Sequence, residues 1–150
     1  MKAFWTTVFE RPTATPTHPG LRAGPRATDR LTVCEKILIA VAAETTRERP
    51  TVASEHLVVT AWEMFPEDFG LRGFTREHPD AARVLCKLSG EYGLVKTGLV
   101  TRVRRGDGEI KITELGKDFA RRLQRWASDG FVGEKPRRVN RPEAPPVSRA

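Results

Sequence analysis

The apolar residues that follow position 30 recur at steps of three and four, which is the spacing of one face of an α-helix. This pattern predicts a first helix over residues 31–48, and Pro50 prevents its extension. Either Thr28 or Thr32 is placed to cap the N-terminus of this helix. The positions that share the predicted face are Val33, Ile37, Val41 and Glu44, with Cys34 and Leu38 beside them.

A second helix is predicted to begin at Thr51 or Ser54 and to reach Phe65, where Pro66 ends it. Its apolar stripe consists of Leu57, Val58, Ala61, Trp62 and Phe65. Residues 67–77 follow, and they contain the run Gly-Leu-Arg-Gly-Phe with two glycines. Because glycines between periodic segments are typical of turns, we predict a loop there.

A third helix is predicted from Pro79 onward. Proline fits the first turn of a helix because an amide hydrogen there has no partner, and Asp80 favours the positive N-terminal end. Gly93 is a good helix terminator. The predicted inward face consists of Val84, Leu85, Leu88 and Tyr92. Arg83 and Lys87 lie four residues apart and are predicted to project from the other side.

A β-hairpin is predicted next, with strands over residues 99–105 and 109–113. The Asp107-Gly108 pair between them is a strong signal for a two-residue turn, and such a turn fixes the register. The predicted pairs on the inward side are Val103 with Ile112 and Arg105 with Ile110. The predicted pairs on the outward side are Arg102 with Thr113 and Arg104 with Lys111.

A last helix is predicted after the hairpin, with Thr113 as its cap and Glu114 in its first turn. Its apolar stripe consists of Leu115, Phe119, Leu123 and Trp126. Its solvated face is predicted to carry Lys117, Arg121, Arg122 and Arg125. The element order is therefore three helices, a small β-hairpin and a helix, which is a mainly α fold of the α+β class.

Charge is concentrated outside these elements, although the chain of 150 residues has a formal net charge of +7. Residues 1–30 and residues 134–150 each carry five basic and two acidic side chains, whereas residues 31–133 carry sixteen and fifteen. Both ends are also rich in proline and poor in apolar residues, which argues against a packed core there. We therefore predict a mostly irregular arm over residues 1–27, one domain over residues 28–133 and a disordered tail beyond it.

The sequence argues against several classes of function. Its longest apolar run, residues 37–43, has seven residues, whereas a membrane-spanning helix needs about 20. No His or Cys pair has the spacing of metal ligands, and neither a Gly-x-Ser-x-Gly nor a phosphate-loop pattern occurs. We therefore predict a cytoplasmic protein that is not an enzyme and holds no metal or cofactor. Its two cysteines, Cys34 and Cys86, lie in predicted helices and are predicted to be reduced residues of the core.

From Pro79 onward the chain resembles the winged helix-turn-helix superfamily of DNA-binding domains. The resemblance rests on Ala-Arg-Val-Leu-Cys-Lys-Leu at residues 82–88, Tyr-Gly-Leu-Val at residues 92–95 and Ile-Lys-Ile-Thr-Glu-Leu-Gly at residues 110–116. One feature departs from the superfamily. Residues 66–78 are longer than its usual turn of three to four residues between helices, and they either hold an extra helical turn or reposition the third helix.

The resemblance implies DNA contacts from two elements. The third helix would enter the major groove, and the residues assigned to it for this purpose are Arg76, His78, Arg83 and Lys87. The hairpin would form a wing that contacts phosphates through Arg102, Arg104, Arg105 and Lys111. The predicted cross-strand pair of Arg104 and Lys111 is a like-charge pair, and a bound phosphate would relieve its repulsion.

These features predict sequence-dependent binding to duplex DNA, as by a transcriptional regulator. The resemblance also implies a homodimer, with the first or last helix as a candidate dimer surface. The alternative is a winged-helix interaction subunit of a larger nucleoprotein complex. The nearly neutral charge of residues 31–133 favours the alternative, because a dedicated DNA reader often has a basic domain. The basic side chains of the third helix and of the wing favour DNA binding.

Overall fold

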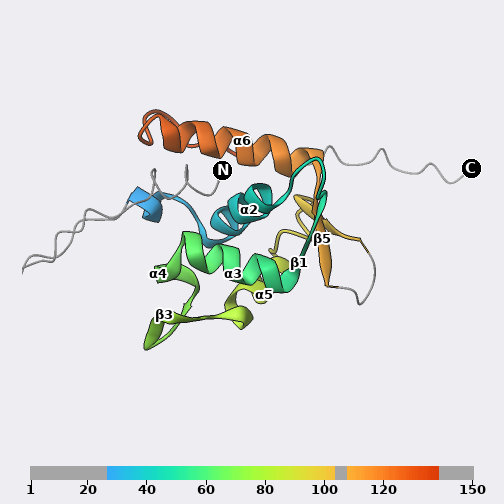
Figure 1. Cartoon of the computed structure of the whole chain (residues 1–150). Helices are drawn as coiled ribbons and strands as arrows, with labels where there is room; N and C mark the ends of the chain where they lie inside the picture. The colour runs from blue at the N-terminus through green and yellow to red at the C-terminus, as the bar shows by residue number, and fades with distance from the viewer. Residues whose placement is uncertain (1–26, 104–107, 139–150) are drawn as a thin grey trace, which may run out of the picture.

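The computed structural model describes residues 27–103 and 108–138, so residues 1–26 and 139–150, most of the predicted arm and tail, lie outside the described part. Its helices are the short 3-10 helix η1 (Ala27–Arg30), α2 (Val33–Glu44), α3 (Ser54–Met64), α4 (Pro66–Phe69), α5 (Ala81–Ser89) and α6 (Glu114–Ser128). Its strands are β1 (Thr51–Ala53), β2 (Gly70–Leu71), β3 (Phe74–Pro79), β4 (Val100–Arg102) and β5 (Glu109–Ile112). Helices dominate and the strands form small antiparallel sheets, so the predicted α+β class is confirmed (Figure 1).

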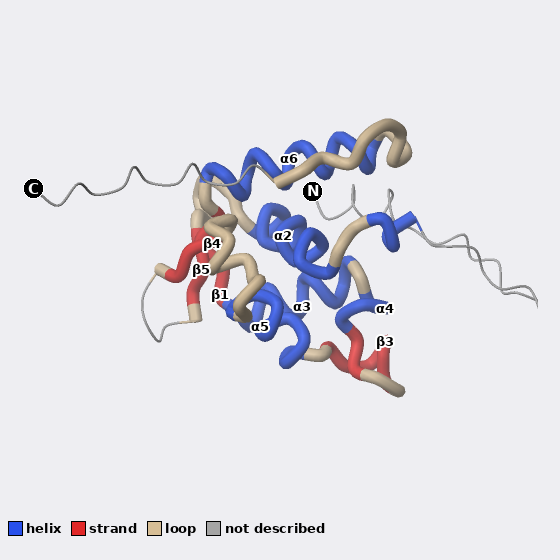
Figure 2. Tube along the Cα trace, turned by 180° about the vertical axis from the view of Figure 1, so that it is seen from behind, coloured by secondary structure: helices blue, strands red, loops and turns tan. Residues whose placement is uncertain are grey.

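Helix α2 lies at the centre, with α6 on one side and α3 and α5 on the other (Figures 1 and 2). All five residues from Ile37 to Val41 have exposed fractions of 0%. Every face of the helix is therefore covered over this stretch. A capping box fixes the start of α2: the Thr32 hydroxyl accepts a hydrogen bond from the Glu35 amide, and the Glu35 carboxylate accepts one from the Thr32 amide.

The first two helices are shorter than predicted. Helix α2 stops before the predicted boundary because Thr45 is extended and the Arg49 amide donates a hydrogen bond to the Thr46 hydroxyl in the turn that follows. Residues 51–53, which include one predicted start of the second helix, form strand β1 instead. Helix α3 begins at Ser54, the other predicted start. The chain thus places a strand between its first two long helices.

Strands β1, β5 and β4 form one antiparallel sheet in that order, and the β4–β5 register differs from the prediction. The observed pairs are Val100 with Ile112, Thr101 with Lys111 and Arg102 with Ile110. Ile112 thus pairs with Val100, which lies three residues before its predicted partner Val103. A shift by an odd number of residues moves every side chain of the strand to the other face. Val100 is accordingly 1% exposed, whereas Val103, which was predicted to be buried, is 44% exposed.

Strand β1 explains this register. Gly108, predicted in a two-residue turn, instead accepts a hydrogen bond of 2.8 Å from the Ser54 amide, beside the pair of Ala53 and Glu109. Its φ of +64° is a conformation that glycine adopts readily. The Val103 amide donates a hydrogen bond to the Glu109 carbonyl, which extends the pairing of β4 with β5 by one residue. The connection between Val103 and Glu109 is therefore longer than the predicted two-residue turn.

The connection between α3 and α5 is built from regular elements, so the predicted loop over residues 67–77 is wrong. The single-turn helix α4 provides the extra helical turn that the length of the connection allows. Strands β2 and β3 then form a hairpin, and Gly73 turns it with a φ of +87°. The Trp62 indole of α3 donates a hydrogen bond of 2.7 Å to the Thr75 carbonyl and so fixes the hairpin on the domain. Strand β3 leads directly into α5.

A buried ion pair joins this connection to the central helix. Lys36 of α2 is 2% exposed, and its Nζ lies 2.7 Å from a carboxylate oxygen of Asp68 in α4. The same Nζ lies 5.8 Å from the centroid of the Phe65 ring. A buried ammonium group needs such partners because its transfer out of water is costly. The pair therefore holds α4, and with it the start of the β2–β3 hairpin, against α2.

Helix α6 covers the opposite side of α2 and begins at the end of β5. The Thr113 hydroxyl caps it by accepting a hydrogen bond from the Gly116 amide. A Cβ atom at position 116 would lie 2.0 Å from the Leu99 carbonyl oxygen. Glycine at this position therefore allows the first turn of α6 to approach the start of β4 closely.

After α6 the chain turns back along the helix (Figure 2). Phe131 is 7% exposed, and its ring lies edge-on to Trp126 with 5.0 Å between the ring centroids. Lys135 forms an ion pair of 2.8 Å with Glu35 of α2. Residues 134–138 of the predicted tail are thus irregular but packed against the domain.

The register can be tested with two matched substitutions. Val100→Asp should lower the free energy of unfolding by about 2 kcal/mol or more, because it buries an unpaired carboxylate. Val103→Asp places the same charge in solvent and should change the free energy of unfolding by less than about 0.5 kcal/mol. Denaturant unfolding measures both values. The reverse order of the two effects would restore the register with Val103 inside.

The buried ion pair can be tested in the same way. Asp68→Asn should lower the free energy of unfolding by about 2 kcal/mol or more, because it leaves the Lys36 ammonium group buried without a counter-charge. Lys36→Met removes that charge but keeps an apolar side chain, so the loss should be smaller. In the double variant the loss should return to that of Lys36→Met alone. A double-variant loss equal to the sum of the two single losses would show that Lys36 and Asp68 do not interact.

Candidate nucleic-acid interface

Helix α5 is held to the domain by a narrow edge. Its N-terminus is capped by Asp80, whose carboxylate accepts a hydrogen bond of 3.0 Å from the Arg83 amide. Only Val84 and Leu88, which are one turn apart, are buried in this helix, and it packs there against α2 and α3. The exposed residues are Ala81, Ala82, Arg83, Leu85, Cys86, Lys87 and Ser89. Most of the helix surface is therefore open to a partner.

Arg83 and Lys87 lie on this exposed surface, as the four-residue spacing predicts. The prediction of a wider inward face is wrong, because Leu85 is 40% exposed and Tyr92 is 86% exposed. Tyr92 is exposed because α5 ends at Ser89, one turn before the predicted terminator Gly93. The Gly90 amide closes the helix with a hydrogen bond of 2.8 Å to the Cys86 carbonyl. The anchored edge of α5 is thus narrower than the sequence indicates.

Arg76 and His78 lie on β3 and not on the helix to which they were assigned. Phe74, Arg76 and His78 occupy alternate positions of this strand, so their side chains lie on one side of it. All three are exposed, and the rings of Phe74 and His78 have their centroids 6.0 Å apart. Because Asp80 follows β3 directly and caps α5, this basic and aromatic strand leads to the N-terminus of the exposed helix.

Arg102 marks the other end of α5. Its guanidinium group donates a hydrogen bond to the Ser89 hydroxyl, which ties the end of β4 to the last residue of the helix. Arg102 pairs with Ile110, so its side chain leaves the strand on the face of the sheet that is turned toward the core. No motif predicts this contact, since Ser89 lies outside all of the motifs described above.

Lys111 lies on the opposite face of the same sheet, where it pairs with Thr101. Its neighbourhood includes Glu114 at the start of α6. The Lys117 side chain hydrogen-bonds to that carboxylate and lowers its pKa, and the charges of Arg121 and Lys111 lower the pKa further. The predicted basic face of the wing is therefore divided, with Arg102 toward α5 and Lys111 toward α6. Arg104 and Arg105 lie outside the described residues.

Basic charge gathers on the elements around α5. Residues 70–103, which run from β2 to the end of β4, carry six basic and three acidic side chains. The rest of residues 31–133 carries ten basic and twelve acidic side chains. The nearly neutral total thus conceals a positive segment. Figure 2 shows α5 between the β2–β3 hairpin and the three-stranded sheet, so this segment covers one side of the domain.

The described residues give little support to other kinds of functional site. In residues 27–103 and 108–138, no three His, Cys, Asp or Glu side chains gather as potential ligands of a metal ion. No helix of this part is long and apolar enough to cross a lipid bilayer. Cys34 and Cys86 are both free; Cys34 is half-buried, whereas Cys86 is exposed on α5, so the prediction that Cys86 belongs to the core is wrong. The surface around α5 therefore remains the strongest candidate for function in the part of the chain that the structure describes.

Comparison of the chain with protein-family models, with curated proteins and with solved structures finds no match. The comparisons thus assign neither a family nor a function. A function has to be inferred from the shape and charge of the surface around α5.

Proposed function

We propose that this chain is a winged-helix protein that binds duplex DNA with α5 in the major groove. The observation that carries the proposal is the combination of a largely exposed helix with a local excess of basic residues. In this interpretation α2, α3 and α5 form the helical core, and the β1–β5–β4 sheet carries the wing. Contacts to phosphates supply most of the affinity, and base contacts from α5 supply the sequence preference.

The dimensions of α5 fit this task. The helix has nine residues, which span about 13 Å at a rise of 1.5 Å per residue. The major groove of B-form DNA is about 12 Å wide and admits one α-helix. Only Val84 and Leu88 of α5 are buried, so the opposite side of the helix can enter the groove without unfolding any part of the domain.

Different side chains take different roles in the complex. Arg83, on the exposed surface near the capped N-terminus of α5, is placed to reach base edges, because such positions of a recognition helix lie closest to the bases. Arg76 of β3 and Arg102 of β4 flank the helix at its two ends and contact phosphates. The hydrogen bond from Arg102 to Ser89 keeps the two elements together as the groove is entered.

A second function, docking onto another protein, is favoured by a separate observation. Three large apolar side chains are exposed on α3 and on the β2–β3 hairpin: Val59 (41%), Leu71 (42%) and Phe74 (55%). Leu71 and Phe74 are paired residues of the hairpin, and exposed apolar side chains that lie together commonly mark protein interfaces. In that case the chain would be an interaction subunit of a larger nucleoprotein complex, and α5 would make a minor contribution to DNA binding or none.

The DNA-binding proposal can be tested with two double variants of the full chain. Arg83→Ala with Lys87→Ala removes two positive charges from α5. Arg121→Ala with Arg125→Ala removes two exposed charges from α6, on the other side of the domain (Figure 1). Both variants keep the basic chain ends, so their difference reports on α5 alone. Fluorescence anisotropy of a labelled duplex at several salt concentrations measures affinity and its salt dependence.

The α5 variant should bind at least about tenfold more weakly than the parent, because a base or phosphate contact from Arg or Lys contributes about 1–3 kcal/mol. If both side chains touch phosphates, the slope of log affinity against log salt should shrink by about 2, at 0.9 per contact. The α6 variant should resemble the parent. Equal losses in the two variants, or the absence of affinity at low salt, would reject the proposal in favour of protein docking.

A further inference from the structure

The outer side of β3 combines aromatic rings with a positive charge. Phe74, Arg76 and His78 are exposed on this side of the strand, and we name these three residues the β3 platform. On the opposite side, Thr75 and Pro79 are half-buried against the domain. Phe74 is 55% exposed, so a partner that covers its ring would remove apolar surface from water and gain free energy.

The two rings of the β3 platform lean toward each other. Residues four apart in an extended strand are separated by about 13 Å, at about 3.3 Å per residue. The ring centroids of Phe74 and His78 nevertheless lie only 6.0 Å apart, with 54° between the ring planes. A third ring between them would need about 7 Å, because stacked atoms stay about 3.5 Å apart. A flat ligand would therefore stack on the outer face of Phe74, with the imidazole behind it.

The β3 platform is fixed on the domain at both ends. The Trp62 indole donates its hydrogen bond to the Thr75 carbonyl, and the Asp80 amide donates one of 2.7 Å to the Phe69 carbonyl. A Cβ atom at position 70 would lie 2.3 Å from the Thr75 carbonyl oxygen, so β2 packs directly against β3. Because the strand is already held in place, a ligand of the β3 platform has little backbone to order.

The charge of the β3 platform favours an anionic partner. Glu77, the one acidic residue of β3, belongs to the opposite side of the strand. The Arg76 guanidinium group has no hydrogen-bond or ion-pair partner among the described residues. Phosphates and unpaired bases alternate along a single strand of nucleic acid, and proteins bind such strands with basic side chains beside aromatic rings. A protein partner would account for the exposed ring alone, whereas a single strand accounts for the ring and the arginine together.

We propose that the β3 platform binds single-stranded DNA, with one unpaired base stacked on Phe74 and an adjacent phosphate on Arg76. The hairpin and the three-stranded sheet lie at opposite ends of α5, and β3 leads into the Asp80 cap of that helix (Figure 2). With α5 in a major groove, the β3 platform would meet DNA at one edge of the bound duplex. The preferred substrate is then a junction between duplex and single strand. This preference rests on the proposed function, whereas binding of a single strand does not.

Binding of a single strand can be tested with a short oligothymidine that carries one 2-aminopurine, whose fluorescence falls when its ring stacks. The full chain should quench this fluorescence. Phe74→Leu keeps an apolar side chain but removes the ring, so it should abolish most of the quenching and weaken binding about fivefold or more. Phe74→Tyr keeps a ring and should resemble the parent.

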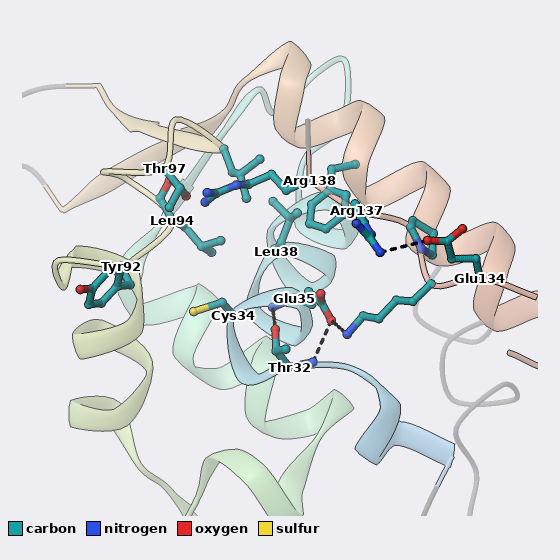
Figure 3. Close-up of a pocket in the computed structure, with 14 residues that line it drawn as sticks. Thr32, Cys34, Glu35, Leu38, Tyr92, Leu94, Thr97, Glu134, Arg137 and Arg138 are labelled. Carbon is teal, nitrogen blue, oxygen red and sulfur yellow. Dashed lines mark hydrogen bonds and ion pairs between the residues drawn. The ribbon is translucent and has the colours of Figure 1, made fainter. Parts of the chain in front are cut away.

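Tyr92 provides a matched control, because it is 86% exposed and lies on the connection between α5 and β4, where it lines the pocket shown in Figure 3. Tyr92→Leu should leave quenching and affinity unchanged. All of these proteins keep the basic chain ends, so their differences report on one ring at a time. Absence of quenching by the parent, or equal binding by the parent and Phe74→Leu, would overturn the proposal and leave protein docking to explain Phe74. Equal losses in Phe74→Leu and Tyr92→Leu would overturn it as well.

The junction preference is measured by anisotropy on a blunt duplex and on the same duplex with a single-stranded overhang of either polarity. The parent should bind one of the overhang duplexes about fivefold or more tightly than the blunt duplex. Phe74→Leu should remove this preference and leave the affinity for the blunt duplex unchanged. Equal affinity of the parent for all of the duplexes would overturn the junction preference. Failure of the parent to bind the blunt duplex would reject the proposed function alone, because the oligothymidine measurement contains no duplex.

Discussion

The complete burial of α2 is the constraint on which the rest of the fold depends. Residues from Ile37 to Val41 have no exposed surface, so each side of the helix must be covered by another element. Helices α3 and α5 cover one side, α6 covers the other, and β5 closes the end. Burial of these side chains provides the main driving force, at about 25 cal/mol per Å² of apolar surface. Lys36 is the one charged residue among the buried residues of α2. Its ion pair with Asp68 holds α4 against this helix.

The same constraint explains how α5 comes to be exposed. The helix contributes only Val84 and Leu88 to the core, so two side chains suffice to hold it over α2 and α3. The β2–β3 hairpin fixes its N-terminal end, because strand β3 runs into the Asp80 cap. Arg102 fixes its C-terminal end through Ser89. A helix held at both ends and along one narrow edge offers a rigid outer surface, which is what recognition of a DNA groove requires.

The sequence predicted the long helices because their signals are local. Apolar spacing, the Thr32 and Thr113 caps and the break at Pro66 lie within a few residues of the structure they determine. The register of β4 and β5 could not be predicted in this way, since it depends on β1, a strand of three residues that is distant in sequence. The carbonyl of Gly108, the glycine of the predicted turn, instead accepts a hydrogen bond from the amide of Ser54, the residue directly after β1.

The candidate site was predicted in part for the same reason. Arg83 and Lys87 follow from helical spacing, and the structure leaves both exposed on α5. Strand β3, which carries Arg76 and His78, was not predicted because it has no apolar alternation: its exposed side carries one aromatic and two polar residues. The packing of Lys135 onto Glu35 has no local signal, since these residues are 100 positions apart in sequence.

The central claim, that α5 faces the DNA, is tested most directly at Cys86. This thiol is exposed on α5 beside Lys87, while Cys34 lies half-buried on α2 and serves as an internal control. The measurement is the rate of maleimide alkylation of each cysteine in the full chain, with and without saturating duplex DNA at low salt. DNA should slow the reaction of Cys86 about tenfold or more, in line with burial of the helix surface in a specific interface, and should leave Cys34 unaffected. An unchanged rate at Cys86, under conditions where anisotropy shows the DNA to be bound, would contradict the assignment of α5 to the interface.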